Sequence, residues 1–278
     1  MGIVSIGQPV PRHEDPILLR GEGRYTGDVS LPNQAYGYVL RSPHAHAQIN
    51  SISTSEAKAA PGVLAVLTGK DYRAENLGKL PLVVPPIPNF DVGSVYHPTR
   101  LALADEVVKF VGEEVAFVVA ETLDQAKDAA EMVEVDYQIL PAVVDAEVSM
   151  EDGAPQVWPD CPDNLSFKQE MGDREATEAA FTAAKYIVKL RSIVNRSSAN
   201  TIEARGTNAN YDPASGHCTV YVGTQGAFGM RKTLAELIFN DEENNFRVIT
   251  GNMGGSFGMK GVYAETLLTV WASRKLHR

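Results

Sequence analysis

The chain has 278 residues and a formal net charge of −10, with 44% hydrophobic and 22% charged residues. These values are typical of a protein with a buried core, and the length predicts one large domain or two modest ones. The acidic balance, without a cluster of lysine or arginine, argues against a protein that binds the phosphate backbone of nucleic acid.

The first quarter of the chain predicts alternating short elements. Residues 1–25 are rich in glycine, proline and charge and indicate an extended lead-in. Residues 35–42 predict a strand; a short helix that ends at Pro61 and Gly62 follows, and then a strand over residues 63–68. The proline-rich stretch from 77 to 98 cannot form a helix and predicts an irregular excursion.

The clearest unit begins at residue 114. Residues 114–120, EVAFVVA, form a continuous apolar run, as in a strand that is covered on both faces. Thr122 and Gln125 make a capping-box pattern that predicts the start of a helix. Residues 133–139 then alternate apolar and polar side chains, which indicates a second strand. Strand, helix and strand together predict a βαβ-like unit or a split version of it.

Residues 146–174 are acidic, contain three prolines and show little periodicity. They indicate a linker between two domains. Beyond the linker, the pattern predicts a helix at 174–184, a strand at 185–194, a hairpin that turns at Asp212–Gly216, a helix at 230–239 and a strand at 246–250.

A glycine-rich stretch, NMGGSFGMKG, occupies residues 252–261. It follows a strand and precedes a helix, which is the usual setting for a phosphate cradle. Its spacing fits neither GxGxxG nor GxxxxGK[ST], so a tight turn is an equally good interpretation. Phe257 is a poor turn residue, however, and predicts a pocket or a flat cofactor for its ring.

The remaining polar candidates are weaker. His44 and His46 would share one face of a strand and could be a pair of metal ligands, but no third ligand has matching spacing, which favours a structural role. Glu203 and Arg205 could be a catalytic acid and a charge clamp, although a solvated pair is the simpler interpretation. We therefore assign no catalytic residue and no metal ligand.

Processing and compartment signals are few. Cys161 and Cys218 lie far apart, and neither belongs to a CxxC pair, which favours two free thiols in a reducing compartment. The first residues lack the features of a secretory signal, and no apolar run is long enough for a membrane span. We expect a cytoplasmic protein.

Several segments, taken in order, resemble one family. They include LRSPHAHAQI, the stretch DEVVKFVGEEVAFVVAETLDQAKDAAEMVEVDYQILPAVVD, and the short blocks EARG, TQG and GGSFGMK. Together they resemble the large, molybdenum-binding subunit of the xanthine dehydrogenase and aldehyde oxidase family, in the branch of carbon monoxide dehydrogenase large chains. The resemblance implies an α+β protein: an α/β hammerhead domain at 15–145, a linker at 146–174, and the truncated start of a molybdopterin-cofactor-binding domain at 175–278.

The resemblance also implies site residues and cofactors. Gly254, Gly255, Phe257 and Gly258 match the family's cofactor-facing loop, and Gln225 matches a glutamine that would hydrogen-bond an oxo ligand of the metal. The implied cofactor is molybdopterin with Mo, in its cytosine dinucleotide form, while FAD and 2Fe-2S clusters would lie on partner subunits.

The function that the resemblance implies is that of a molybdenum hydroxylase or carbon monoxide dehydrogenase-type large subunit. It would oxidise an aldehyde, an N-heterocycle or CO with water-derived oxygen and pass electrons to an iron–sulfur small subunit and a flavin-binding medium subunit. We expect a dimer of heterotrimers, and we expect the isolated chain, without the remainder of the large subunit, to be inactive. The alternative is a catalytically inactive scaffold or assembly fragment with the same fold.

Three positions depart from the family pattern. Ser256 stands in place of a glycine, and Ala204 in place of a proline. Gly261 stands where members that oxidise purines have a glutamate, which argues against a purine substrate.

Overall fold

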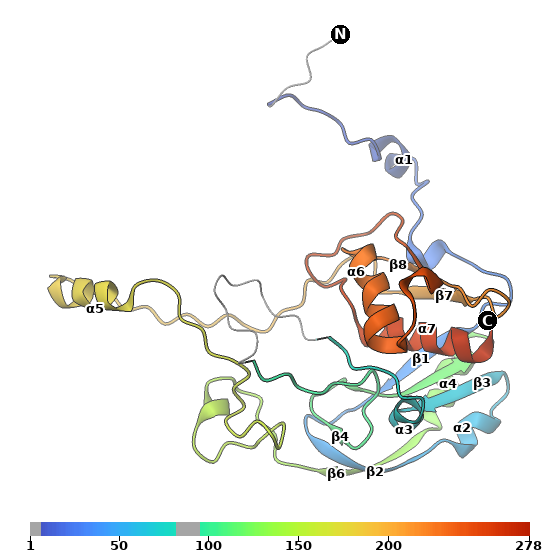
Figure 1. Cartoon of the computed structure of the whole chain (residues 1–278), viewed down its shortest axis with the longest axis horizontal. Coiled ribbons are helices and arrows are strands. Elements are labelled where there is room, and N and C mark those ends of the chain that lie inside the picture. The colour runs from blue at the N-terminus through green and yellow to red at the C-terminus, as the bar shows by residue number, and fades with distance from the viewer. Residues whose placement is uncertain (1–6, 82–94) are drawn as a thin grey trace.

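The computed structural model describes residues 7–81 and 95–278, and within them the chain has the expected α+β architecture (Figure 1). Its strands are β1 Tyr36–Arg41, β2 Ala47–Ser53, β3 Val63–Thr68, β4 Val107–Val108, β5 Glu114–Ala120, β6 Glu134–Ile139, β7 Thr207–Tyr211, β8 Cys218–Val222 and β9 Phe246–Ile249. Its α-helices are α1 Asp15–Leu19, α2 Ser55–Ala59, α3 Gly69–Ala74, α4 Leu123–Glu131, α5 Arg174–Ala183, α6 Ala227–Lys232 and α7 Ala264–Leu276.

Strand β5 is the centre of an antiparallel sheet with the order β1-β5-β3. Every residue of β5 is buried. Alternate side chains enter different cores: Phe117 and Val119 face the C-terminal half of the chain, whereas Ala116 and Val118 face α4. This arrangement explains the continuous apolar run and confirms the prediction of a strand that is covered on both sides.

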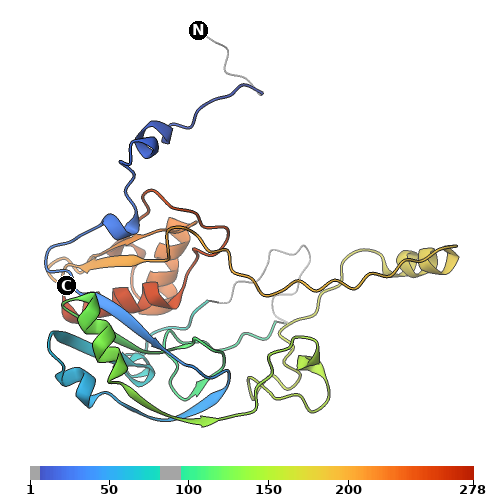
Figure 2. The same ribbon diagram turned by 180° about the vertical axis from the view of Figure 1, so that it is seen from behind.

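The predicted capping box begins α4. The Thr122 hydroxyl accepts a hydrogen bond from the Gln125 backbone N–H at 3.2 Å, and the Gln125 side chain accepts one from the Thr122 N–H at 3.1 Å. Seen from behind, α4 (green) lies against β1 (blue) in Figure 2. Strand β6 then enters a second sheet, of order β4-β2-β6, so the unit is the split version and not a single-sheet crossover.

The third sheet belongs to the C-terminal half. β7 and β8 form the predicted hairpin, and β9 pairs with β8 in parallel. Helix α7 packs on β7 and also reaches β5, so that it is buried on most of its circumference. One hydrophobic core therefore continues from Phe117 of the first sheet to Leu267 and Trp271 of α7.

Several predictions require correction. Residues 185–194 form no strand: they are exposed and lie with α5 on an arm that projects from the body (Figure 1). A strand needs a neighbouring strand to satisfy its backbone groups, and residues 185–194 pair with no strand of the described chain. The N-terminal lead-in contains the short helix α1. The helix predicted at 230–239 begins earlier, at α6, and continues as a π-helix over Thr233–Phe239.

The irregular excursion falls only partly within the described residues. Its ends, 77–81 and 95–98, contain neither helix nor strand, and its central part lies outside the described residues. No helix in the described part of the chain has the length and apolar character needed to cross a bilayer.

Candidate functional site

Two loops meet at one edge of the third sheet. Because β8 and β9 run in parallel, Val222 and Ile249 end their strands at the same edge. The segments 223–226 and 250–263 follow directly, so the chain order and the pairing bring them together. Ligands of sheets with parallel strands commonly bind outside such carboxyl ends.

Threonine side chains brace these two loops. The Thr250 hydroxyl donates a hydrogen bond to the Val222 carbonyl at 2.6 Å and accepts one from the Thr224 N–H at 3.1 Å. The Thr224 hydroxyl accepts a further bond from the Gly226 N–H at 3.3 Å. The two loops are thus fixed to each other at the point where they leave the sheet.

The glycine loop has an unusual backbone. Gly255, Phe257 and Gly258 have φ angles of +97°, +51° and +86°. A left-handed conformation is common for glycine but uncommon for phenylalanine, which places local strain at this loop. Within the described chain, the backbone N–H groups of these three residues have no acceptor in hydrogen-bond distance. Successive free N–H groups of this kind form a concave site for an anionic oxygen.

The glycines differ in what they allow. A Cβ on Gly254 would lie 2.5 Å from the Cβ of Glu203, so close approach of the two backbones requires glycine there. A Cβ on Gly258 would meet nothing within 4 Å, so this position borders open space. The loop is packed on one side and open on the other.

Phe257 does not enter a pocket of this chain. Its side chain is 78% exposed, and the ring folds back beside Gly255, where an added Cβ would be 3.1 Å from Cε2. The expectation of a pocket formed by the described residues is therefore wrong. The second expectation, that the ring faces a flat cofactor, stays a prediction.

A buried ion pair lies beneath the loop. The Lys260 ammonium is 2.6 Å from a carboxylate oxygen of Glu203, with side chains 1% and 14% exposed. Burial alone raises the pKa of Glu203, but hydrogen bonds from Lys260 and from the N–H groups of Gly254 and Thr26 outweigh it and hold the pKa below its ordinary value. The interpretation of Glu203 as a solvated residue is wrong.

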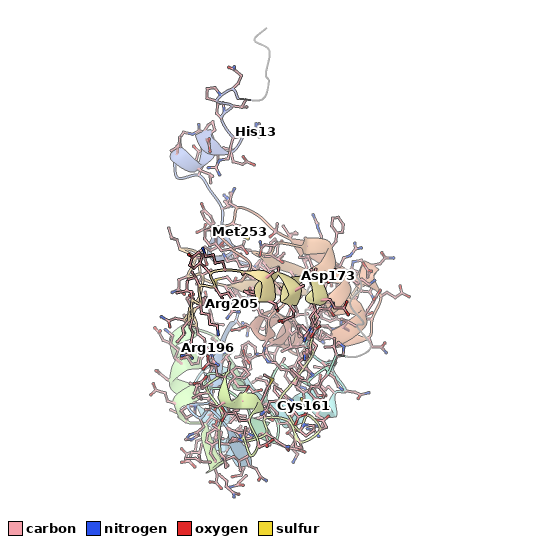
Figure 3. All side chains as sticks on the ribbon, turned by 90° about the vertical axis from the view of Figure 1, so that its left-hand side faces the viewer. His13, Cys161, Asp173, Arg196, Arg205 and Met253 are labelled. Atoms are coloured by element: carbon pink, nitrogen blue, oxygen red, sulfur yellow. The ribbon has the colours of Figure 1, made fainter. Side chains whose placement is uncertain are left out.

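Gln225 lies on the neighbouring loop. Its backbone N–H donates to the Lys260 carbonyl at 3.1 Å, whereas its side chain is exposed and makes no hydrogen bond among the described residues. The side-chain amide is therefore free to bind a ligand. Figure 3 labels Met253 of the glycine loop above Arg205 of the segment that follows Glu203.

The other candidate residues take structural positions. Arg205 stacks over the Tyr263 ring at 4.8 Å and lies 3.7 Å from Glu265. His44 contacts the Tyr137 ring edge-on, and His46 Nδ1 lies 2.7 Å from the Pro141 carbonyl.

The chemistry of the site follows from its donor set. Among the described residues, no group of three His, Cys, Asp or Glu side chains could hold a metal ion. The site offers instead backbone N–H groups on the glycine loop, the exposed Phe257 ring, and the primary amide of Gln225 on the neighbouring loop. This set fits an oxygen-rich anionic group that brings its own metal ligands. It includes Gly255, Phe257 and Gly258 of the expected loop residues, whereas the N–H of Gly254 is bound to Glu203.

Sequence reasoning missed the role of Lys260. The sequence shows Lys260 after the glycines and Glu203 in the EARG block, but no spacing or motif indicates that the two side chains form an ion pair. Ser256, the departure from the family pattern, is also accommodated: it is buried, and its hydroxyl accepts a hydrogen bond from the Lys260 N–H at 3.2 Å.

Two family models match the chain. Residues 20–141 match the a/b hammerhead domain of aldehyde oxidase and xanthine dehydrogenase, and residues 157–278 match the molybdopterin cofactor-binding domain.

Individual relatives belong to the same group of enzymes as these two family models. The carbon monoxide dehydrogenase large chain of Afipia carboxidovorans is 38% identical over 94% of this chain and 32% of its own length. The nicotine 6-hydroxylase large subunit of Paenarthrobacter nicotinovorans is 33% identical over 98% of this chain and 32% of its own. The structure of quinoline 2-oxidoreductase from Pseudomonas putida 86 has a TM-score of 0.86 and 32% identity, covering 98% of this chain and 34% of that chain. The chain thus spans about a third of the length of these relatives.

Proposed function

Because this chain belongs to the aldehyde oxidase and xanthine dehydrogenase family, we propose that it forms part of the molybdenum-binding large subunit of an oxidoreductase. One observation carries the proposal. The unpaired N–H groups of Gly255, Phe257 and Gly258 lie on the loop that follows β9, and the free side chain of Gln225 lies on the loop that follows β8, which is hydrogen-bonded to the first loop through the Lys260 carbonyl.

In this proposal the chain supplies one wall of the cofactor site. The loop N–H groups would donate hydrogen bonds to oxygen atoms of the bound cofactor, and the Gln225 amide would donate one at its metal end. Gly258 would let the backbone approach the cofactor closely, and the exposed Phe257 ring would be available to pack on it. When bound, molybdopterin with Mo supplies the redox chemistry, and the protein binds and orients it.

The substrate is a small molecule: an aldehyde, an N-heterocycle or CO. The relatives named for carbon monoxide, nicotine and quinoline support this range, and the oxygen added would come from water. Gly261, in the position of a purine-specific glutamate, disfavours a purine.

The proposal extends to partners. Since the chain spans about a third of its relatives, other parts of the large subunit would complete the site. Electrons would pass to an iron–sulfur small subunit with 2Fe-2S clusters and to a flavin-binding medium subunit with FAD, in a dimer of heterotrimers in the cytoplasm. The pterin would be the cytosine dinucleotide form.

Metal and pterin analysis of the complete large subunit tests the proposal. We expect close to one molybdenum and one pterin for each subunit. A folded, complete subunit that contains neither would support the alternative of an inactive scaffold, which no present observation favours.

A further inference from the structure

Lys260 is an unusual residue for the interior of a protein. Its side chain is 1% exposed, and its ammonium is 2.6 Å from Glu203. Removing a charge from water costs free energy that a single ion pair repays only with good geometry, and apolar residues of similar volume often stabilise as well. A buried pair at this position therefore suggests a role in fixing a conformation.

The Glu203 carboxylate joins segments that are distant in sequence. Besides Lys260, it accepts hydrogen bonds from the Gly254 N–H at 2.8 Å and the Thr26 N–H at 3.2 Å. The Glu203 N–H in turn donates to the Gly254 carbonyl at 3.3 Å. The glycine loop and the EARG segment therefore each donate a hydrogen bond to the other.

Lys260 extends the connection to the second loop. Its carbonyl accepts the Gln225 N–H, and its own N–H donates to Ser256. The lysine stem passes Gly223, where an added Cβ would lie 3.5 Å from Cδ. Lys260 thus contacts Gly223 and Gln225 of the first loop and Ser256 of the glycine loop.

The N-terminal segment also contacts the glycine loop and Glu203. Arg24 N–H donates to the Asn252 side-chain oxygen at 2.8 Å, and Asn252 N–H donates to the Arg24 carbonyl at 3.1 Å. Thr26, two residues further on, donates its N–H to Glu203. Residues 24–26 are therefore docked onto the base of the glycine loop.

We propose that Glu203 and Lys260 are positioning residues, which set the glycine loop and the Gln225 loop in one fixed relation and anchor both to the segment 24–26. The purpose of this relation, to present N–H and amide donors to the cofactor, rests on the proposed function. The positioning itself is a property of the chain and can be measured without cofactor.

Hydrogen exchange of the 278-residue chain tests the positioning. In Lys260→Met we expect the amides of Gly254 and Gln225 to exchange on the order of tenfold faster, because the carboxylate loses its cation and Lys260 its anchor. In Glu203→Gln we expect a larger effect, since an unpaired ammonium stays buried. The double variant should lose less protection than the sum of the two single variants.

Glu243→Gln is the matched control. It breaks the Arg231–Glu243 pair, also 2.6 Å long, in the same half of the chain, and should leave both amides unchanged. If Glu203→Gln does not fold, Lys260→Met and the double variant still decide the question. Unchanged exchange at Gly254 and Gln225 in folded Lys260→Met would overturn the proposal.

A second readout separates this proposal from the proposed function. In the complete subunit, we expect Lys260→Met to retain several-fold less molybdenum after gel filtration than the parent. A parent subunit without molybdenum would refute the proposed function and leave the exchange result intact. Full molybdenum retention in Lys260→Met, with faster exchange, would overturn only the role of the pair toward the cofactor.

Discussion

Trp271 and Glu75 are 196 positions apart, yet the indole N–H of Trp271 donates a hydrogen bond to the Glu75 carboxylate at 2.7 Å. The Trp271 ring also meets the Tyr72 ring edge-on, with centroids 5.3 Å apart. Helix α7 is therefore fastened to α3 and to the loop that follows it. The hammerhead half of the chain and the C-terminal half share this contact and one core.

This contact predicts cooperative unfolding. Trp271→Ala should lower the free energy of unfolding by about 3–5 kcal/mol, because it removes a large buried side chain. We expect a single transition in which both halves lose structure together, measured by circular dichroism and by the exchange of β5 amides. Loss of α7 with β5 protection unchanged would contradict a shared core.

The glycine loop predicts unequal effects of adding one methyl group. Gly254→Ala should destabilise the chain by about 1–3 kcal/mol, because the new Cβ would press on Glu203 and force one backbone to move. Gly261→Ala, where a Cβ meets nothing within 4 Å and φ is not positive, should change the melting temperature little. Equal melting temperatures for the two variants would refute the close approach at Gly254.

The lowered pKa of Glu203 predicts a pH dependence. A carboxyl group whose pKa falls on folding stabilises the protein fully when the pH is above the group's ordinary pKa of 4.5. This contribution is lost as the pH falls through the pKa of the folded state. The melting temperatures of the parent and of Glu203→Gln should therefore differ most near neutral pH and converge as pH falls below that ordinary value. A difference that stays constant down to about pH 3 would show that ionised Glu203 contributes nothing.

For the exposed arm we predict fast exchange of backbone amide hydrogens. Amides of residues 185–194 should exchange at rates close to those of an unfolded chain, because the segment is exposed and forms no strand, whereas β8 amides should be protected. In the complete subunit we expect the arm to become protected. Protection equal to that of β8 in the 278-residue chain would show that the arm has a partner within it.

Local patterns explain what the sequence could predict. The apolar run of β5 and the Thr122 capping box act over a few residues, so the sequence predicts the bounds of β5 and the start of α4. Residues 185–194 have the composition of a strand, but strand preference is realised only beside a neighbouring strand. Composition alone could not reveal that the neighbour is missing here.

The candidate site divides in the same way. The glycine loop is contiguous, and its residues allowed either a phosphate cradle or a tight turn, while the family resemblance implied that the loop faces the cofactor. The Glu203–Lys260 pair joins residues 57 positions apart, and no periodicity or spacing links them. Its existence depends on how the EARG segment folds over the loop, which only the three-dimensional structure shows.

Turnover per bound molybdenum in the complete subunit tests most directly the proposal that Gln225 and the glycine loop form one wall of a molybdenum cofactor site. The Gln225→Ala subunit should retain its metal and its fold, because the Gln225 side chain is exposed and makes no hydrogen bond to any described residue. Loss of one preorganised donor should lower turnover per molybdenum on the order of 100-fold. A Gln225→Ala subunit with full molybdenum content and parental turnover would contradict the claim.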